Sequence, residues 1–245
     1  MSHKLELKEG ALLIADAHYS PSRPELLQLI EAIATQKVQT PQLILMGDIF
    51  DNLFGSIEYT YEANQKMITL LKQIAQKIEV VYLEGNHDFY LKVVFENIRV
   101  IPIQQQPYSC EYKDKKVILA HGDFNGALGY KIYTALIRNP VILKILRFID
   151  NNTQHSIINY VQNHLDKKDD CREFTGFRDF IEKRIVKFFK CDYFIEGHFH
   201  QNKSLKFENL NYINLGAFAC NQRYFIVKSL EDKELLEEKT FSRGM

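Results

Sequence analysis

The chain has 245 residues, of which 46% are hydrophobic, and its 31 basic and 31 acidic residues give a formal net charge of +0. This size is typical of one globular domain, or of one domain with an insertion, and the charge does not support a general nucleic-acid binder. The first ten residues lack an apolar signal core, and no stretch has the roughly 18 apolar residues that span a bilayer. No CxxC pair occurs, which disfavours a zinc knuckle or disulfide framework and favours a reducing cytosol. The four cysteines are Cys110, Cys171, Cys191 and Cys220.

Apolar runs and amphipathic stretches alternate in the first third of the chain. Residues 11–15, 42–46 and 79–83 are predicted to be buried strands, and the stretches 25–33 and 57–77 have helical spacing. This alternation predicts an α/β sheet with parallel segments. Open sheets of this kind usually bind ligands at the carboxyl ends of their strands.

A fourth strand is predicted at 116–120, and the strand pattern then stops until 192–196. Residues 124–190 carry apolar positions at helical spacing, which predicts a helical insertion. Because His121 precedes it and His198 follows it, we expect this insertion to stand over a site as a cap. Three later strand-like runs are expected to form a second, antiparallel portion: 203–208, 211–214 and 223–228.

Five short polar motifs each follow directly after an apolar run, and they contain five of the eight histidines. A single motif of this kind is more often chance, a turn or a buried structural histidine. Five buried strands that each end in Asp, Asn or His instead predict a metal site at one edge of a sheet. The motifs are Asp16-Ala17-His18, Gly47-Asp48-Ile49-Phe50-Asp51, Gly85-Asn86-His87-Asp88, His121-Gly122-Asp123 and Gly197-His198-Phe199-His200.

The ligand chemistry of these motifs is that of a hard to intermediate metal ion. Carboxylate oxygen, amide oxygen and imidazole nitrogen suit Mn²⁺, Fe²⁺ or Zn²⁺, and no thiolate is present to select a soft ion. Seven candidate ligands are too many for one ion, but they suit two ions about 3.5–4 Å apart that share one carboxylate. Such a pair lowers the pKa of a bound water and neutralises charge on a phosphoryl oxygen.

The ordered series D-x-H, G-D-x-x-D, G-N-H-D, H-G-D and G-H-x-H, from residue 16 to residue 200, resembles the calcineurin-like metallophosphoesterase superfamily. The resemblance implies an α/β sandwich of two mixed sheets flanked by helices, within a single domain that spans 1–245 and carries a helical cap at 124–190. It also implies two divalent ions, with Mn²⁺ preferred and Fe²⁺ or Zn²⁺ as alternatives. By motif position, the first ion would bind Asp16, His18 and His200, the second Asn86, His121 and His198, and Asp48 would bridge them.

The same resemblance implies roles for the residues around the two ions. Asn86 would also touch the substrate phosphate, and His87 would contact a phosphate oxygen or protonate the leaving group, with Asp88 as its orienting partner. The alternative for His87 is a hydrogen bond without proton transfer. Asp51 and Asp123 are expected to orient ligands rather than to bind metal.

The first part of the insertion, 124–149, contains no Asp or Glu and is otherwise largely apolar. A basic amphipathic stretch is typical of an element that faces a membrane surface or a lipid. A helical hairpin that packs on its own core is the alternative. The basic residues of this part are Lys131, Arg138, Lys144 and Arg147, and Lys167, Lys168 and Arg172 follow as candidates to meet a diphosphate or as solvated charges.

A basic, apolar insertion between H-G-D and G-H-x-H resembles the UDP-2,3-diacylglucosamine pyrophosphatases of lipid A biosynthesis, as does Leu128-Gly129-Tyr130. The resemblance implies hydrolysis at the α-phosphate to UMP and 2,3-diacylglucosamine 1-phosphate, by a cytoplasmic enzyme peripheral on the inner membrane. That family commonly has Arg where this chain has His87, and its loop after H-G-D is longer and carries an acidic pair. The implied substrate-binding residues are Asn86, Tyr130, Lys131, Arg138, Lys167, Lys168 and Arg172.

Two alternatives to the lipid substrate remain open. The first is a soluble metallophosphoesterase that acts on nucleotides or other phosphodiesters, which the histidine at position 87 favours and the apolar insertion disfavours. The second is a non-catalytic scaffold, which the seven filled ligand positions disfavour. No nucleic-acid partner is expected, and the sequence leaves the oligomeric state undetermined.

Overall fold

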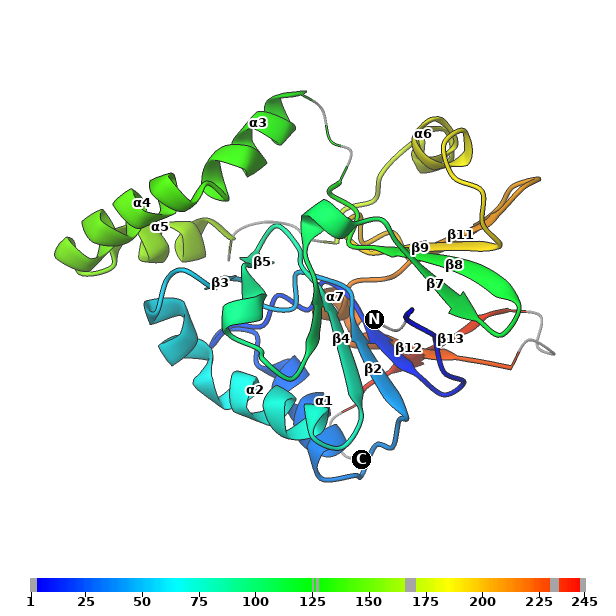
Figure 1. The fold of residues 1–245 in the computed structure, drawn as a ribbon, viewed down its shortest axis with the longest axis horizontal. Coiled ribbons are helices and arrows are strands. Elements are labelled where there is room, and N and C mark those ends of the chain that lie inside the picture. The colour runs from blue at the N-terminus through cyan, green and yellow to red at the C-terminus, as the bar shows by residue number, and fades with distance from the viewer. Residues whose placement is uncertain (1–3, 125, 127, 166–170, 230–233, 243–245) are drawn as a thin grey trace.

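Two mixed sheets form the centre of the structure, and helices lie on their outer faces (Figure 1). The computed structural model describes residues 4–124, 126, 128–165, 171–229 and 234–242. The larger sheet has the order β13-β12-β1-β2-β4-β6, with β1, β2, β4 and β6 parallel and β12 antiparallel to both of its neighbours. Its strands are β1 (Leu12–Ile14), β2 (Gln42–Leu45), β4 (Glu79–Leu83), β6 (Arg99–Ile101), β12 (Arg223–Val227) and β13 (Leu236–Thr240).

The smaller sheet has the order β10-β11-β9-β8-β7, in which β8, β9 and β11 are parallel. The outer strands β7 and β10 are antiparallel to their neighbours, and a separate pair, β3 with β5, is parallel. The strands are β3 (Leu53–Phe54), β5 (Asp88–Phe89), β7 (Tyr108–Tyr112), β8 (Lys115–Ala120), β9 (Tyr193–Glu196), β10 (Lys203–Lys206) and β11 (Asn211–Asn214).

The expected α/β fold with two mixed sheets is confirmed. The prediction that the last three strand-like runs form one antiparallel portion is wrong. Only β10 and β11 pair with each other in that way, since β12 crosses into the larger sheet beside β1. The apolar pattern of a strand does not say which sheet receives it.

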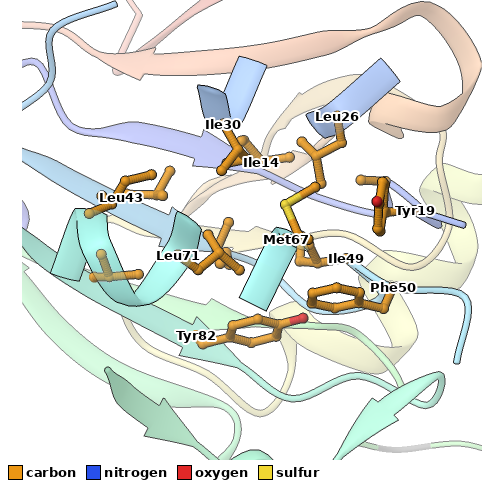
Figure 2. Close-up of a cluster of buried hydrophobic side chains, with 14 of the residues drawn as sticks. Ile14, Tyr19, Leu26, Ile30, Leu43, Ile49, Phe50, Met67, Leu71 and Tyr82 are labelled. Carbon is orange, nitrogen blue, oxygen red and sulfur yellow. The ribbon is translucent and has the colours of Figure 1, made fainter. Parts of the chain in front are cut away.

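The core is divided by the larger sheet because neighbouring side chains of a strand point to opposite faces. Leu12 and Ile14 of β1 pack toward the helices α1 and α2, whereas Leu13 packs between the two sheets. On α1, Leu26, Leu29, Ile30 and Ile33 are all buried and follow the i, i+3, i+4, i+7 spacing of an amphipathic helix. Figure 2 shows this cluster around Ile14, Leu26, Met67 and Leu71. The two helices are α1 (Glu25–Ala34) and α2 (Tyr59–Ala75).

Three helices project from one side of the molecule and form the cap (Figure 1). The side chain of Asn139 caps the start of α4 by accepting hydrogen bonds from the backbone N–H groups of Val141 and Ile142. Pro140 occupies the first helical position, where the missing backbone N–H of proline costs no helical hydrogen bond. Within the described residues no helix is long and apolar enough to cross a membrane. The cap helices are α3 (Leu128–Ile137), α4 (Pro140–Asn152) and α5 (Ser156–Leu165).

The last part of the insertion packs on the smaller sheet. Phe177, Ile181 and Ile185 lie in one apolar cluster with Phe194 of β9 and Tyr212 of β11. Residues 177–185 therefore belong to the core. The expectation that the whole of 124–190 acts as a cap stays a prediction. The elements concerned are α6 (Phe177–Ile181) and the π-helical turn η3 (Glu182–Val186), and the remaining short helices are η1 (Leu91–Val93), η2 (Ile103–Gln105) and α7 (Phe218–Asn221).

A disulfide joins Cys171 to Cys220, although the wide spacing of the cysteines disfavoured a disulfide framework. The two residues are 49 positions apart in sequence, but the chain that leaves the cap returns beside α7, which brings their Cα atoms to 5.8 Å. Sequence spacing cannot report that approach. Cys110 and Cys191 are free and buried.

Candidate metal centre

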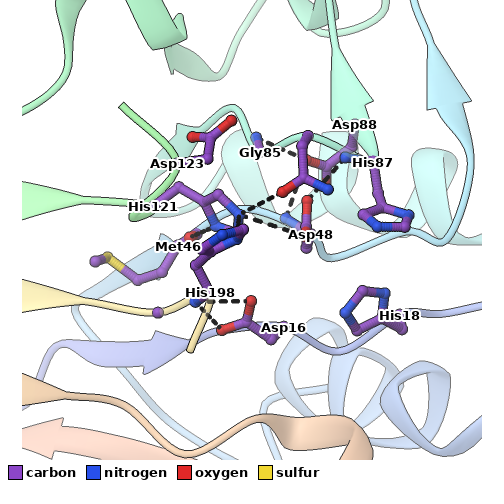
Figure 3. A network of polar contacts seen from close by, with 12 residues as sticks. Asp16, His18, Met46, Asp48, Gly85, His87, Asp88, His121, Asp123 and His198 are labelled. Carbon is purple, nitrogen blue, oxygen red and sulfur yellow. Dashed lines mark hydrogen bonds and ion pairs between the residues drawn. The ribbon is translucent and has the colours of Figure 1, made fainter. Parts of the chain in front are cut away.

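The seven predicted ligands gather at one edge of the two sheets, each just beyond the end of a strand. Figure 3 shows five of them: Asp16, His18, Asp48, His121 and His198. The backbone adopts unusual conformations where the ligands converge. Several of these residues have positive φ angles, which are uncommon outside glycine. Such strained conformations cluster at functional sites. The angles are 50° at Asp16, 46° at His18, 50° at Asp48, 64° at His198 and 57° at His200.

Gly47 is required for the approach of two of these loops. Its φ is +86°, and a Cβ atom there would lie 2.5 Å from Nδ1 of His121, which is closer than atoms can approach. His121 Nδ1 in turn donates a hydrogen bond to the carbonyl oxygen of Met46 at 3.0 Å. The glycine of the second motif therefore lets the β2 loop fix the ring of a predicted ligand on β8.

The first cluster consists of Asp16, His18 and His200, whose ligand atoms lie within 4.8 Å of one another. Nε2 of His200 is 3.2 Å from Oδ1 of Asp16. His18 donates from Nδ1 to Oδ1 of Asp51 at 3.0 Å, so its Nε2 atom carries a lone pair. That Nε2 atom is buried and has no hydrogen-bond partner among the described residues. An orphaned imidazole lone pair of this kind fits a metal ion.

The second cluster contains Asp48, His121 and His198, with Asn86 in contact. His121 uses Nδ1 as its donor, and its Nε2 atom faces three further groups. It lies 3.3 Å from Oδ2 of Asp48, 3.3 Å from Oδ1 of Asn86 and 3.2 Å from Nδ1 of His198. Carboxylate oxygen, amide oxygen and imidazole nitrogen that converge in this way make a donor set that fits a divalent ion.

The charges of the buried groups agree with that arrangement. Burial, together with the nearby His121, lowers the pKa of His198 to about 4, which keeps its ring neutral as a metal ligand must be. Burial opposes a charge on His121, but Asp48 raises the pKa of His121 well above its ordinary value. Without an ion, a proton on His121 would thus replace part of the missing positive charge.

Hydrogen bonds hold the two carboxylates in place. Both oxygens of Asp16 accept from the backbone N–H of His198, at 3.0 and 2.9 Å, so β1 fixes the loop after β9. Oδ1 of Asp48 accepts from the backbone N–H of His87 at 2.9 Å, which leaves Oδ2 to the second cluster. The bridging role of Asp48 stays a prediction.

His87 and Asp88 follow Asn86 but have different surroundings. Nδ1 of His87 lies 3.0 Å from the carbonyl oxygen of Asp51, to which it donates, and this contact orients the ring. Asp88 is fully buried, and its oxygens accept from Tyr82 and from the backbone of the second and third motifs. Burial and the nearby Asp48 raise the pKa of Asp88 to about 7. Asp88 therefore holds two loops together, whereas the ring of His87 is held by the carbonyl oxygen of Asp51.

Arg138, a predicted substrate-binding residue, lies between the cap and the metal centre. Its Nη2 atom donates to the carbonyl oxygen of Gly85 at 2.8 Å and to Oδ2 of Asp123 at 3.0 Å. The guanidinium also lies over the ring of Phe89, 5.4 Å from its centroid. The cap is thus tied to the residue that precedes Asn86.

Of the other predicted substrate-binding residues, Asn86 belongs to the second cluster, and no contact of a described side chain places Arg172 beside the metal centre. Arg172 is exposed, and its carbonyl oxygen accepts from Gln201 at 3.0 Å. Lys167 and Lys168 lie outside the described residues, as do the side chains of Tyr130 and Lys131.

Two buried charges beside the site were missed by sequence reasoning. Glu196 ends β9, and Arg184 lies in η3 and binds it. A Glu at the end of the otherwise apolar run Tyr193–Glu196 was the available signal, since an unpaired carboxylate is rarely buried. Its partner is 12 residues away and could not be named from spacing alone.

This fold and these two clusters define a metal-dependent hydrolase of phosphoesters. The calcineurin-like phosphoesterase family model matches residues 11–202, so the chain belongs to that family.

Known proteins that resemble the chain include curated hydrolases. A UDP-2,3-diacylglucosamine hydrolase from Histophilus somni (strain 129Pt) is 28% identical over 199 residues, which cover 77% of this chain and 82% of that protein. Another from Tolumonas auensis is 32% identical over 114 residues, 46% of each chain. Among solved structures, the E. coli phosphoesterase Yfce aligns over 95% of this chain and 99% of its own at 13% identity, with a TM-score of 0.46. The resemblance to UDP-2,3-diacylglucosamine hydrolases is confirmed at the level of a divergent relative.

Proposed function

We propose that this hydrolase cleaves the diphosphate of UDP-2,3-diacylglucosamine, releasing UMP and 2,3-diacylglucosamine 1-phosphate as a step of lipid A biosynthesis. The supporting observation is an apolar cavity of about 180 Å³ that opens beside Asn86 and His87 and extends under the cap. A site that cleaves a lipid-linked diphosphate needs an apolar chamber next to its phosphate-binding groups. The apolar residues around the cavity are Phe54, Ile57, Phe89, Ile137, Leu143, Leu146, Ile157, Ile158 and Val161.

The cavity belongs to the contact between the cap and the core. Leu143 of α4 packs against Ile57 and Phe89, and Ile137 and Ile158 pack around them. Its volume is below the roughly 300–1,000 Å³ of pockets for drug-sized ligands. Two acyl chains therefore require the cap helices to move apart, and the proposal includes that movement.

The chemistry would rest on two divalent ions, with Mn²⁺ as the preferred ion. When bound by the two clusters, they would activate a water and neutralise charge on the phosphoryl group. Asn86 is proposed to contact the phosphate as well as an ion. His87, oriented by its Nδ1 contact to Asp51, would present Nε2 to a phosphate oxygen or to the leaving oxygen. Arg138 is proposed to bind the diphosphate from its anchored position beside Gly85.

The cap also carries a second apolar stripe, on the outer side of α4. Val141, Ile145 and Phe148 are 64%, 54% and 70% exposed, with Lys144 exposed beside them. An apolar stripe with basic neighbours suits the surface of an anionic bilayer, where a lipid substrate resides. We therefore propose peripheral contact with the cytoplasmic face of the inner membrane through this stripe.

The test of the reaction is incubation of the enzyme and Mn²⁺ with UDP-2,3-diacylglucosamine in detergent, with UMP and the lipid 1-phosphate measured by mass spectrometry. Both products are expected. Absence of UMP, together with turnover of bis(4-nitrophenyl) phosphate, would overturn the lipid substrate and favour a soluble phosphodiesterase.

A variant pair tests the chamber itself. Ile158→Trp fills the cavity, whereas Tyr160→Trp, on the same helix, changes a side chain that is 73% exposed. Exclusion of about two methylenes, at ~0.8 kcal/mol each, corresponds to roughly a tenfold loss in kcat/KM for the diacyl substrate. We expect that loss only in Ile158→Trp, with hydrolysis of bis(4-nitrophenyl) phosphate unchanged in both variants. Equal behaviour of the two variants on the lipid would contradict the chamber.

A matched pair also tests the membrane contact. Phe148→Glu lies in the outer stripe of α4, and Phe188→Glu changes an equally exposed phenylalanine outside the three cap helices, at 69% exposure. Sedimentation with phosphatidylglycerol-containing vesicles should weaken for Phe148→Glu and not for Phe188→Glu. Undiminished sedimentation of Phe148→Glu would contradict the proposed surface.

A further inference from the structure

Arg184 is a buried cation that lies outside both ligand clusters. It is 7% exposed, and its guanidinium lies over the rings of Phe124 and Phe199, 4.3 and 5.1 Å from their centroids. Its two amino groups have separate partners. Nη1 donates to Oε1 of Glu196 at 2.6 Å, and Nη2 donates to the carbonyl oxygen of Gly122 at 2.5 Å.

These two partners belong to the two loops that carry the histidines of the second cluster. Gly122 directly follows His121, and Glu196 stands two residues before His198. The strands that lead to them, β8 and β9, pair in parallel, with Ala120 opposite Glu196. Arg184 thus joins the two loops through its side chain, just beyond the point where the two strands end.

The spacing between these loops is already tight. Gly122 has a φ of +136°, and a Cβ atom there would lie 2.7 Å from Cβ of His198. Tyr212 also holds Glu196, because its hydroxyl donates to the same Oε1 atom at 2.6 Å. Small shifts of either loop would therefore change the distance between the two imidazoles.

The buried ion pair between Arg184 and Glu196 has an energetic cost, which bears on its role. Burying two charges carries a desolvation penalty that their attraction often only offsets, so a buried ion pair is weak evidence for stability. Oε2 of Glu196 is also buried and has no hydrogen-bond partner among the described residues. Arg184 lies in a π-helical turn, a local irregularity that is frequent at functional sites. A geometric role accounts for these features better than a contribution to folding.

We propose that Arg184 is a positioning residue for the second metal ion: by binding Gly122 and Glu196 together, it sets the distance between His121 and His198. It touches neither the ion nor the substrate. The inference rests on the proposed ligand set, but it does not depend on the lipid substrate.

The test compares a double variant with a matched control. Arg184→Met with Glu196→Gln removes both charges, so no unpaired charge remains in the core. Arg147→Met with Glu58→Gln removes a more exposed Arg–Glu pair, joined at 3.1 Å, that links the cap to the core and includes no residue of either cluster. Metal-free protein of each kind is titrated with Mn²⁺ by calorimetry, and folding is checked by circular dichroism and thermal melting.

We expect two Mn²⁺ sites in the unchanged protein and in the control variant. In the Arg184 and Glu196 variant, one site should keep its affinity and the other should weaken by about 10- to 100-fold, as is typical when a group that orients a ligand is lost. Two sites of unchanged affinity, or equal weakening of both sites, would overturn the proposal.

A second variant keeps the test decisive if the double variant does not fold. Arg184→Lys retains the charge but cannot reach two partners with the separate amino groups of a guanidinium. It should weaken the same single site, and unchanged binding would overturn the proposal. Because the measured quantity is metal binding, a negative lipid assay would leave this result standing.

Discussion

The Nδ1 atom of His18 lies 3.0 Å from Oδ1 of Asp51, with side-chain exposures of only 3% and 2%. This contact decides which nitrogen of the ring carries the proton. A carboxylate on Nδ1 leaves Nε2 as a lone pair, and that atom is the one without a partner. Asp51, which ends the second motif, thus orients His18, which ends the first motif, for binding a metal ion.

Asp51→Asn should therefore weaken metal binding without removing a ligand. An amide is neutral and holds the imidazole less strongly, so we expect the affinity of one Mn²⁺ site to fall by about 10- to 100-fold. Calorimetric titration of the metal-free protein measures this. Asp114→Asn, at a side chain that is 77% exposed, is the matched control and should bind as the unchanged protein does. Equal affinities in the two variants would contradict the role of Asp51.

Removal and return of the metal should change stability. Oδ2 of Asp48 and Oδ1 of Asn86 both lie close to Nε2 of His121, and an ion bound by these atoms would stabilise the folded protein. Mn²⁺ at 100 times its dissociation constant should raise the free energy of unfolding by about 2.7 kcal/mol per site, measured by urea denaturation of chelator-treated protein. Ca²⁺, which prefers oxygen ligands, should give a smaller increase. If Mn²⁺, Fe²⁺ and Zn²⁺ all left the urea midpoint unchanged, the ligand assignment would be wrong.

The sequence predicted the strands that carry the site because each is an apolar run followed by a polar motif. β1, β2, β4, β8 and β9 all have that form, and their carboxyl ends meet where the motifs predicted. β7 and β13 were not predicted, since β7 alternates buried with exposed residues and β13 is mostly exposed. β3 and β5 have only two residues each, too few for a period to be visible.

Contacts between distant residues were the features that sequence reasoning could not reach. Arg138 was expected to face a substrate, yet its Nη2 atom already binds Asp123, 15 positions away. The disulfide and the Arg184 link depend in the same way on where the chain returns after the cap. The sequence shows that a charged residue is present, but its partner can be identified only from the folded structure.

Arg138→Met should destabilise the protein much more than the loss of an exposed ion pair. Asp123 is fully buried at its side chain, so removal of its partner leaves an unpaired buried charge, at a cost of about 3–5 kcal/mol. Arg147→Met is the control, because the Arg147 and Glu58 side chains are 39% and 73% exposed and such pairs contribute about 0–1 kcal/mol. Urea denaturation gives both values.

A double variant separates this effect from a simple loss of packing around Arg138. Adding Asp123→Asn to Arg138→Met removes the unpaired charge and should recover about 0.5–3 kcal/mol of the loss. Failure to recover any stability would show that the ion pair is not the cause.

The four cysteines should fall into two classes of reactivity. Burial raises the pKa of the Cys110 thiol to about 12 and that of Cys191 to about 11, and both are enclosed by the core. Because only the thiolate reacts, iodoacetamide at pH 8 should label neither residue in the folded protein, and labelling should increase only as the pH rises toward those values.

Reduction should make the disulfide-bonded class of cysteine accessible to the label, and unfolding should then expose the buried class. Opening the bond between Cys171 and Cys220 with a dithiol under native conditions should give two labelled thiols, and denaturation after reduction should give four, as counted by mass spectrometry. A variant with Cys171→Ser and Cys220→Ser should show no native labelling with or without the reductant. Labelling of Cys171 and Cys220 before reduction would show that the bond is absent in solution, whereas native labelling of Cys110 or Cys191 would show that the core opens around them.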